Sequence, residues 1–241
     1  MPAPVSRAAF EEQLVAAAGR YPFEDTRLHH LLAAGRCPPA MLRRYARALH
    51  QGAVDFCGLL AALVEAAPDR EARGVLLDNL MEEEGIVLRP GRGLERNPQQ
   101  RHAAWAERFV LACGGGVEGA GAPAGGLATG HVGALLDEGR WLEAVSFLLV
   151  GQEMAFSSVS ARLAALFGDL GFARRDLVFF EAHIHADRRH AREALDLVLD
   201  RAVTAGQQRA CVAAAEAGAR DWWLRHGGAP TGAGATAAAV P

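Results

Sequence analysis

Apolar and polar residues recur along this chain with the period of an α-helix almost from end to end. Ala, Leu, Arg and Glu dominate, and the two-residue alternation of β-branched residues that is typical of strands is missing. Read with its glycine and proline breaks, the pattern predicts helices over about 7–18, 40–65, 69–84, 99–113, 135 or 141–167, 173–204, and one ending near 223. We therefore expect an all-α bundle.

Three segments lack this period. "GIVLRPGRGLERNPQQ" (85–100) is rich in Gly, Pro and Arg and is predicted to be a loop. "GGGVEGAGAPAGGLATG" (114–130) is predicted to be a flexible connector, and "GAPTGAGATAAAVP" (228–241) a disordered tail. With no internal repeat and no composition shift elsewhere, residues 1–227 are predicted to form one helical domain.

Composition narrows the function classes. The 241 residues are 51% hydrophobic and carry a net charge of −3, so a globular fold is expected and nucleic-acid binding is not. Four scattered cysteines without a CxxC motif are typical of a reducing compartment, and neither a signal peptide nor a membrane span is predicted, so we expect a cytoplasmic protein. The chain contains no lysine, which excludes a lysine Schiff base and a lysine amine donor.

The segment "EAHIHADRRH" (181–190) concentrates side chains that bind metals. On a continuous helix, His183, Asp187 and His190 lie at about 0°, 40° and −20° around the axis, while His185 lies on the opposite side. Their stripe is apolar before and after, so buried polar groups there need partners or a metal. The alternative is an exposed polar face on which Asp187 pairs with a neighbouring arginine.

A carboxylate interrupts the apolar helix "WLEAVSFLLVGQEMAFSSVS" (141–160). The neighbours of Glu153 one turn away are Leu149 and Phe156, so a charge at this position needs a partner. The alternative is a helix-edge glutamate that pairs with Arg162. A buried carboxylate on this helix would complement the ligands of 181–190.

Three successive glutamates in "NLMEEEG" (79–85) end an earlier helix. They point in different directions, and Glu83 continues the apolar stripe better than Glu82 or Glu84. The alternative is a solvated acidic last turn, which the helix dipole disfavours.

A histidine opens the next predicted helix, "HAAWAERF". His102 shares a face with Trp105 and Phe109, although a merely exposed histidine at a helix start would look the same. The combined candidate ligands are Glu83, His102, Glu153, His183, Asp187 and His190. Three carboxylates and three imidazoles suit two divalent first-row ions, and a set without thiolates favours iron or manganese over zinc.

At these residues the sequence resembles the haem-oxygenase-like dimetal oxidases and oxygenases, whose superfamily includes pyrroloquinoline-quinone synthases and thiaminases. The matching pieces are "NLMEEEG", "HAAWAERFVLACG", Glu153 in its apolar helix, and "HIHADRRH" as His-x3-Asp-x2-His. The early helices, "LHHLLAAGRCPPAMLRRYARALHQGAVDFCGLLAAL", are also similar. The resemblance covers about residues 20–205.

The resemblance implies a haem-oxygenase-like bundle of seven to eight helices in which the six residues hold two Fe(II) ions, with manganese as an alternative. It implies an enzyme that activates O₂ and oxidises a small amino-acid-like or carboxylate substrate, by N-oxygenation or oxidative C–C cleavage, in a biosynthetic pathway. Glu83 and His102 are farther apart than is usual in the family, so 85–100 is either an insertion that loops out or a break in the helix. The branch that makes p-aminobenzoate is disfavoured because the chain has no lysine.

The remaining expectations concern substrate, partners and alternatives. Arg189 and Tyr45 are predicted to contact the substrate, and no catalytic acid or base is assigned. The expected partners are O₂ and a small molecule, with neither nucleic acid nor a membrane, and the superfamily suggests a homodimer. One alternative is a metal-free oxidase or binding protein, similar to pyrroloquinoline-quinone synthase, that uses histidines as acid and base. A purely structural bundle is the other.

Overall fold

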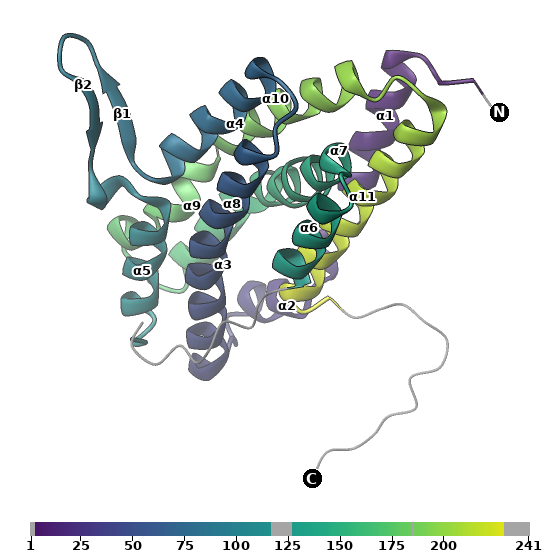
Figure 1. Ribbon diagram of the computed structural model, residues 1–241. Helices are drawn as coiled ribbons and strands as arrows, with labels where there is room; N and C mark the ends of the chain where they lie inside the picture. Colours follow the sequence, from purple (N-terminus) through teal and green to yellow (C-terminus); the bar gives the residue numbers. More distant parts are fainter. Residues whose placement is uncertain (1–2, 117–126, 185, 229–241) are drawn as a thin grey trace.

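The computed structural model describes residues 3–116, 127–184 and 186–228, and most of them are helical (Figure 1). The predicted all-α class is confirmed. The α-helices are α1 (Arg7–Ala18), α2 (Arg27–Ala33), α3 (Pro39–Glu65), α4 (Arg70–Glu83), α5 (His102–Ala112), α6 (Leu127–Asp137), α7 (Trp141–Val145), α8 (Met154–Asp169), α9 (Val178–His183), α10 (Ala186–Arg201) and α11 (Ala205–Arg225). Short 3-10 helices are η1 (Phe23–Asp25), η2 (Pro98–Gln100) and η4 (Arg174–Asp176), and two strands, β1 (Ile86–Arg89) and β2 (Gly93–Arg96), form a hairpin.

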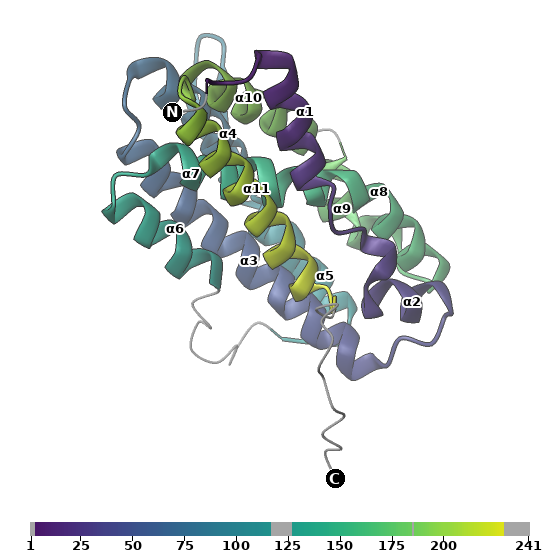
Figure 2. The same ribbon diagram turned by 90° about the vertical axis from the view of Figure 1, so that its right-hand side faces the viewer.

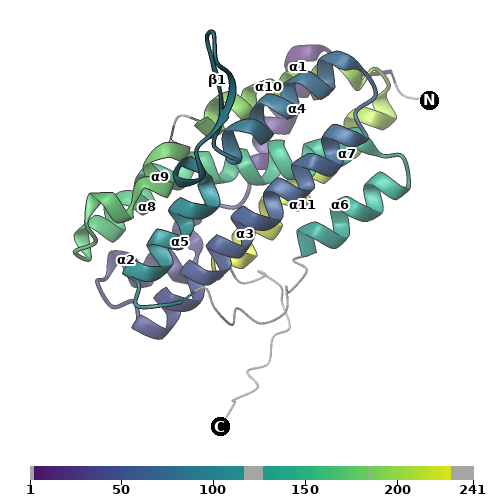
Figure 3. The same ribbon diagram turned by 60° about the vertical axis from the view of Figure 1, so that its left-hand side comes forward.

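One long, continuous helical segment, called the central rod below, runs through the bundle. α7, the π-helical segment η3 (Ser146–Glu153) and α8 follow one another without a break, and every residue of η3 is buried. α11 runs along η3, and α1, α8 and α10 also pack against it (Figure 2). The long helix α3 packs against α4 and α5 (Figure 3). The rod passes the length and composition criteria for a membrane span, as α3 does, but most of the rod lies inside the bundle.

Glycines bring α11 and η3 unusually close together. A Cβ atom added at Gly151 would lie 2.9 Å from the Cα atom of Gly218 and 3.0 Å from the backbone nitrogen of Ala219. Because these neighbours are backbone atoms, no side-chain rotation can relieve the contact. The Gly151–Gly218 crossing therefore sets the position of the C-terminal end of α11 relative to the C-terminal end of η3.

The hydrophobic core has two clusters. One is built around Phe10, Leu60, Leu148 and Val198, where α1, α3, η3 and α10 meet. The other contains many aromatic side chains, among them Tyr45, Phe109, Phe167 and Phe180, whose rings contact one another. Glu153 ends η3, which belongs to the first cluster, and is followed directly by α8, which belongs to the second.

The predicted loop over 85–100 is wrong, because most of it forms the β1–β2 hairpin that projects from the bundle (Figure 1). The strands are antiparallel, with Ile86 opposite Arg96 and Arg89 opposite Gly93. Gly91 and Gly93 turn the chain at φ of 74° and 79°. Four-residue strands with one apolar pair are too short to show an alternation, so the turn residues dominated the prediction.

Two further boundaries differ from the sequence prediction. The single helix expected over 173–204 is divided into η4, α9 and α10, and α6 begins within the predicted connector. Residues 117–126, most of that connector, lie outside the described part of the chain, as do His185 and 229–241, nearly all of the predicted tail. The predicted single domain over 1–227 stays a prediction.

Candidate metal centre

Six buried carboxylate and imidazole side chains converge in the bundle, and the most exposed of them is only 6% accessible. They form two groups, and within each group the possible ligand atoms lie within 4.8 Å of one another. The groups are Glu83, His102 and His183, and Glu153, Asp187 and His190. They meet where His183 Nε2 lies 3.9 Å from Asp187 Oδ1. The structure thus brings together all six residues that the sequence singled out.

Five of these side chains come from the first two residues or the last residue of a helical segment, and His190 lies about one turn inside α10. Glu83 is the last residue of α4 and His102 the first of α5, while Glu153 ends η3. His183 ends α9, and α10 begins just before Asp187. The π-helical turn of η3 changes the direction in which its last side chain points, a feature that is frequent at functional sites.

The break between α9 and α10 divides the late ligands between the two groups. His183 belongs to the first group, whereas Asp187 and His190 belong to the second. The expected continuous helix is therefore wrong, because α9 ends at His183 and α10 begins at Ala186, but all three side chains are buried at the centre, as predicted.

The three glutamates that end α4 have different surroundings. Glu83 is 3% exposed and faces the group. The carboxylate of Glu84 turns outward to Arg96 and to Arg101, whose Nη2 lies 3.2 Å from Glu84 Oε1. Glu82 is at the edge, where its side chain is 37% exposed. Of the alternatives left open by the sequence, Glu83 is the residue that lies inside.

The hairpin closes on itself and returns the chain to the group. The backbone N–H of Asn97 donates a 2.8 Å hydrogen bond to the carbonyl of Gly85 at the base of the hairpin. His102 then follows within a few residues, and its Nδ1 lies 2.7 Å from Glu83 Oε1. The helix thus ends at Glu83 and a new helix begins at His102, with a hairpin that loops out between them, so both features that the sequence raised as alternatives are present.

Gly85 at the hairpin base gives a testable consequence. Its φ is +64°, and an added Cβ would lie 2.5 Å from the carbonyl oxygen of Asn97 and 3.0 Å from the backbone nitrogen of Arg101. We expect Gly85→Ala to cost about 2–4 kcal/mol of unfolding free energy and to displace His102, which weakens metal binding. Gly91→Ala is the control, because Gly91 has the same sign of φ and no atom within 4 Å. Equal urea-unfolding and metal-binding curves for the two variants would show that the close packing at Gly85 does not fix the position of His102.

Carboxylate oxygens without partners mark the second group. Among the described residues, both oxygens of Asp187 and Oε2 of Glu153 are buried and accept no hydrogen bond. Burial, followed by repulsion from Glu153 and Glu83, raises the pKa of Asp187 well above its usual range, and burial likewise raises the pKa of Glu153. A cation at this position would supply the missing partner for these oxygens.

The histidines complement these carboxylates. His183 Nδ1 bonds to the backbone carbonyl of Phe179, which leaves Nε2 to face Asp187. Burial and repulsion from His102 lower the pKa of His183 to about 4, so its imidazole is neutral and able to bind a metal. The six side chains offer only nitrogen and oxygen atoms, and their three carboxylates offset most of the charge of two divalent ions. The set therefore fits two ions of the iron or manganese type.

Comparison with known proteins identifies the chain's relatives. Residues 43–223 match the model of a family described as iron-containing redox enzymes. The chain belongs to this family. The matched segment contains all six candidate ligands, and the helical bundle agrees with the haem-oxygenase-like fold that the sequence suggested. No curated protein matches the sequence.

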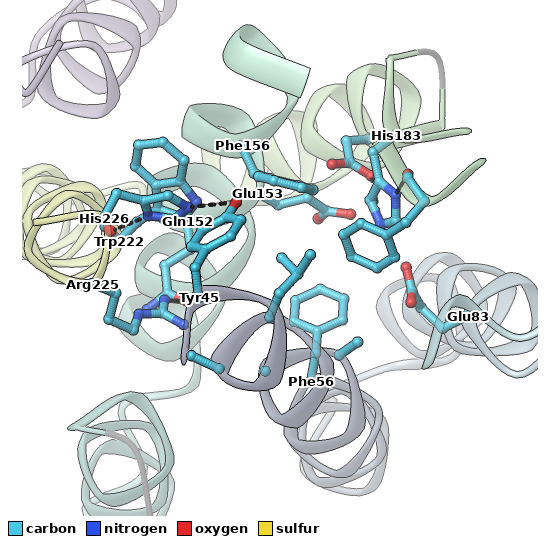
Figure 4. A pocket seen from close by; sticks show the side chains of 16 residues that line it. Tyr45, Phe56, Glu83, Gln152, Glu153, Phe156, His183, Trp222, Arg225 and His226 are labelled. Carbon is cyan, nitrogen blue, oxygen red and sulfur yellow. Dashed lines mark hydrogen bonds and ion pairs between the residues drawn. The ribbon is translucent and has the colours of Figure 1, made fainter. Parts of the chain in front are cut away.

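A cavity connects the candidate metal centre of this iron-containing redox enzyme to a polar group of residues on α11 and η3 (Figure 4). Its volume is about 130 Å³. Glu83, Glu153 and His183 lie at one end, and Phe56 and Phe156 form part of the apolar wall between the ends. The lining at the other end includes Tyr45, Gln152, Trp222, Arg225 and His226. The cavity can therefore hold a molecule that touches the metal ligands and the polar end together.

Arg225 is the guanidinium in the cavity wall, and the sequence prediction missed it. Its Nη2 donates to Gln152 Oε1 at 2.7 Å and lies 3.2 Å from Asp221 Oδ2. Gln152 Nε2 in turn donates to Asp221 Oδ2 at 2.9 Å, so the three side chains hold one another in place. The only signal in the sequence was the end of the last helix, where "WWLRH" mixes aromatic and basic residues.

The two residues predicted to contact the substrate lie in different places. Tyr45 lines the cavity, and its hydroxyl lies 3.4 Å from His226 Nε2. Arg189 is outside the cavity lining: its side chain is 56% exposed and pairs with Glu82. Arg189 therefore pairs with the last turn of α4 and is not among the residues that line the cavity.

Proposed function

We propose that this protein is an O₂-dependent oxidase or oxygenase that binds two iron ions, one in each group of ligands. The observation that carries the proposal is the pair of buried groups, with Asp187 and Glu153 offering carboxylate oxygens that have no other partner among the described residues. Family membership supports iron as the metal. Manganese is the alternative, since it accepts the same ligand types.

When bound, the iron pair would supply the redox chemistry that activates O₂. The chain's own residues would hold this chemistry in a dry and fixed geometry. Phe56, Phe156 and Phe179 exclude water from the side of the cavity next to the ligands. Because the ligands lie on helical segments that pack in two large clusters, their positions are defined by the whole bundle rather than by one loop.

The substrate that we propose is a small amino-acid-like or carboxylate compound, oxidised by N-oxygenation or C–C cleavage. Arg225 is at the opposite end of the cavity from the metal ligands, and only one of its nitrogen atoms, Nη2, is engaged in the contacts described. A carboxylate bound to the remaining N–H groups would extend the rest of the molecule toward Glu153 and Asp187.

Arg225→Met is expected to weaken the use of such substrates. Loss of a charge-assisted hydrogen bond of about 1.5–3 kcal/mol corresponds to an increase in KM of about 10- to 100-fold. The measurement is substrate-dependent O₂ consumption by iron-loaded protein over a panel of amino acids and simple carboxylates. Arg20→Met removes an equivalent charge, which pairs with Glu216 at the surface, and serves as the control. Equal KM values for the two variants would contradict the assignment of Arg225.

Anaerobic titration with ferrous iron, followed by O₂, tests the proposal directly. We expect two iron ions to bind per chain and O₂ to be consumed only after loading. The metal-free alternative predicts O₂ consumption that survives removal of iron and does not depend on Asp187. Fewer than one iron bound per chain would rule out the dimetal proposal.

A cytoplasmic location and a homodimer remain predictions.

A further inference from the structure

The ring of His190 lies between two carboxylates. Nδ1 is 3.2 Å from Glu153 Oε1 on the buried side, and Nε2 is 3.3 Å from Glu82 Oε2 at the edge of the bundle. The His190 side chain is 1% exposed, whereas that of Glu82 is 37% exposed. One ring nitrogen therefore faces the second group of ligands, and the other faces a carboxylate that belongs to neither group.

A neutral imidazole can offer a lone pair at only one nitrogen, because the other carries the proton. A histidine that binds a metal usually donates its second N–H to a carboxylate or a carbonyl, which sets the tautomer. The backbone carbonyl of Phe179 takes this part for His183. His190 needs an acceptor at Nε2 if Nδ1 is to bind the metal beside Glu153.

We propose that Glu82 is this acceptor and that it holds His190 in the tautomer whose Nδ1 lone pair faces the metal. Glu82 is thus a positioning residue that acts through His190, and the inference rests on the proposed metal centre. Glu82 would then be a seventh side chain that the metal centre needs, although it is not itself a ligand.

Arg189 competes with Glu82 for Nε2 of His190. Its guanidinium pairs with Glu82, and Nη2 also lies 2.9 Å from His190 Nε2. A guanidinium only donates hydrogen bonds, so it can bond to Nε2 only when that nitrogen carries no proton. In the absence of the Glu82 carboxylate, Arg189 would therefore favour the opposite tautomer, in which Nδ1 is protonated and cannot bind a metal.

Titration with Co(II), a spectroscopic substitute for Fe(II), tests this role in the full-length protein. Glu82→Ala is expected to keep two binding sites and to weaken the affinity of one by about 10- to 100-fold. Glu82→Gln, whose amide oxygen still accepts from Nε2–H, is expected to lose less. The double variant Glu82→Ala with Arg189→Met is expected to recover part of the loss, because the donor that favours the wrong tautomer is gone. Glu84→Ala, two residues away and paired with Arg96 and Arg101, is the control.

Proton NMR of the Co(II)-loaded protein gives a second readout that a merely structural role would not change. Each histidine bound to Co(II) contributes a strongly shifted N–H signal, and we expect the His190 signal to exchange faster with water in Glu82→Ala. Circular dichroism checks that each variant is folded.

Two results would overturn the inference. Equal affinity and equal N–H exchange in Glu82→Ala and Glu84→Ala would mean that Glu82 does not position His190. A drop to one bound ion in both Glu82→Ala and Glu82→Gln would make Glu82 a direct ligand instead. Failure of the unmodified protein to bind either Co(II) or Fe(II) would be a different result, since it would overturn the metal centre itself together with this role.

Discussion

Asp187→Asn is expected to stabilise the metal-free protein and to prevent assembly of the iron pair. Asp187 is 1% exposed, and neither of its carboxylate oxygens accepts a hydrogen bond from the described residues. An asparagine removes the repulsion from Glu153 and Glu83 and brings an amide donor into the group that contains the unpartnered Glu153 Oε2. We expect a gain of about 1–3 kcal/mol in the chelator-treated protein, or roughly 2–4 °C in Tm for each kcal/mol.

The gain should depend on pH in a defined direction. Because the folded-state pKa of Asp187 is raised above its unfolded value, the unmodified apo-protein loses stability as the pH rises above about 4. The difference between the variant and the unmodified protein should therefore be small near pH 4 and larger at pH 7. The variant should bind less iron than the unmodified protein, because an amide is a poor iron ligand. We expect it to bind no more than one ion per chain.

Asp196→Asn is the matched control, because Asp196 lies on the same helix but pairs with Arg7 and Arg192 at the surface. Its loss is expected to change stability by no more than about 1 kcal/mol and to leave iron binding intact. The two variants are compared by thermal unfolding of the chelator-treated, metal-free proteins near pH 4 and at pH 7. Metal analysis of the iron-loaded proteins gives the number of ions bound per chain. Two ions retained by Asp187→Asn would exclude Asp187 as a ligand.

Gly218→Ala is expected to be the most destabilising single change considered. An added Cβ would overlap the carbonyl oxygen of Phe147 and would lie 2.9 Å from the carbonyl carbon of Phe147 and 3.2 Å from the Cα atom of Gly151. Only separation of α11 from η3 can relieve contacts with backbone atoms. We expect a loss of about 3 kcal/mol or more and a decrease in Tm of roughly 6–12 °C. Separation would also displace Arg225 from Gln152 and so impair substrate binding.

Gly58→Ala separates this effect from the ordinary consequences of replacing glycine in a helix. Gly58 lies within α3, and nothing would contact its Cβ within 4 Å. The replacement is expected to stabilise the protein by about 0.5–1 kcal/mol, since alanine has the better helix propensity. Denaturant unfolding of both variants measures the two signs. A Gly218→Ala protein as stable as Gly58→Ala would show that the α11–η3 crossing is not as close as described.

Much of the fold could be predicted because helical periodicity is a local property. The bounds of α1 were predicted exactly and those of α3 to within one residue, since Ser6 and Pro38–Pro39 provide local start signals for these helices. The hairpin was missed because its strands are short and exposed, with Leu88 at 71% and Leu94 at 65%, and so leave no buried stripe in the sequence. The π-helical segment η3 was missed because all its residues are buried and its middle, Phe147–Val150, is a continuous apolar run without a period.

The chemical nature of the candidate centre was determined by the sequence by itself. Carboxylates and imidazoles that interrupt apolar stripes are costly to bury, and this cost can be recognised without coordinates in Glu83, Glu153 and His190. How these residues are shared between two groups, and which other residues serve them, was decided only by the tertiary structure. The break before Asp187 divides the late ligands, Arg225 rather than Arg189 lines the cavity, and Glu82 lies against His190. The positions of Arg225 and Glu82 depend on contacts between segments more than 70 residues apart, and no spacing along a single helix contains them.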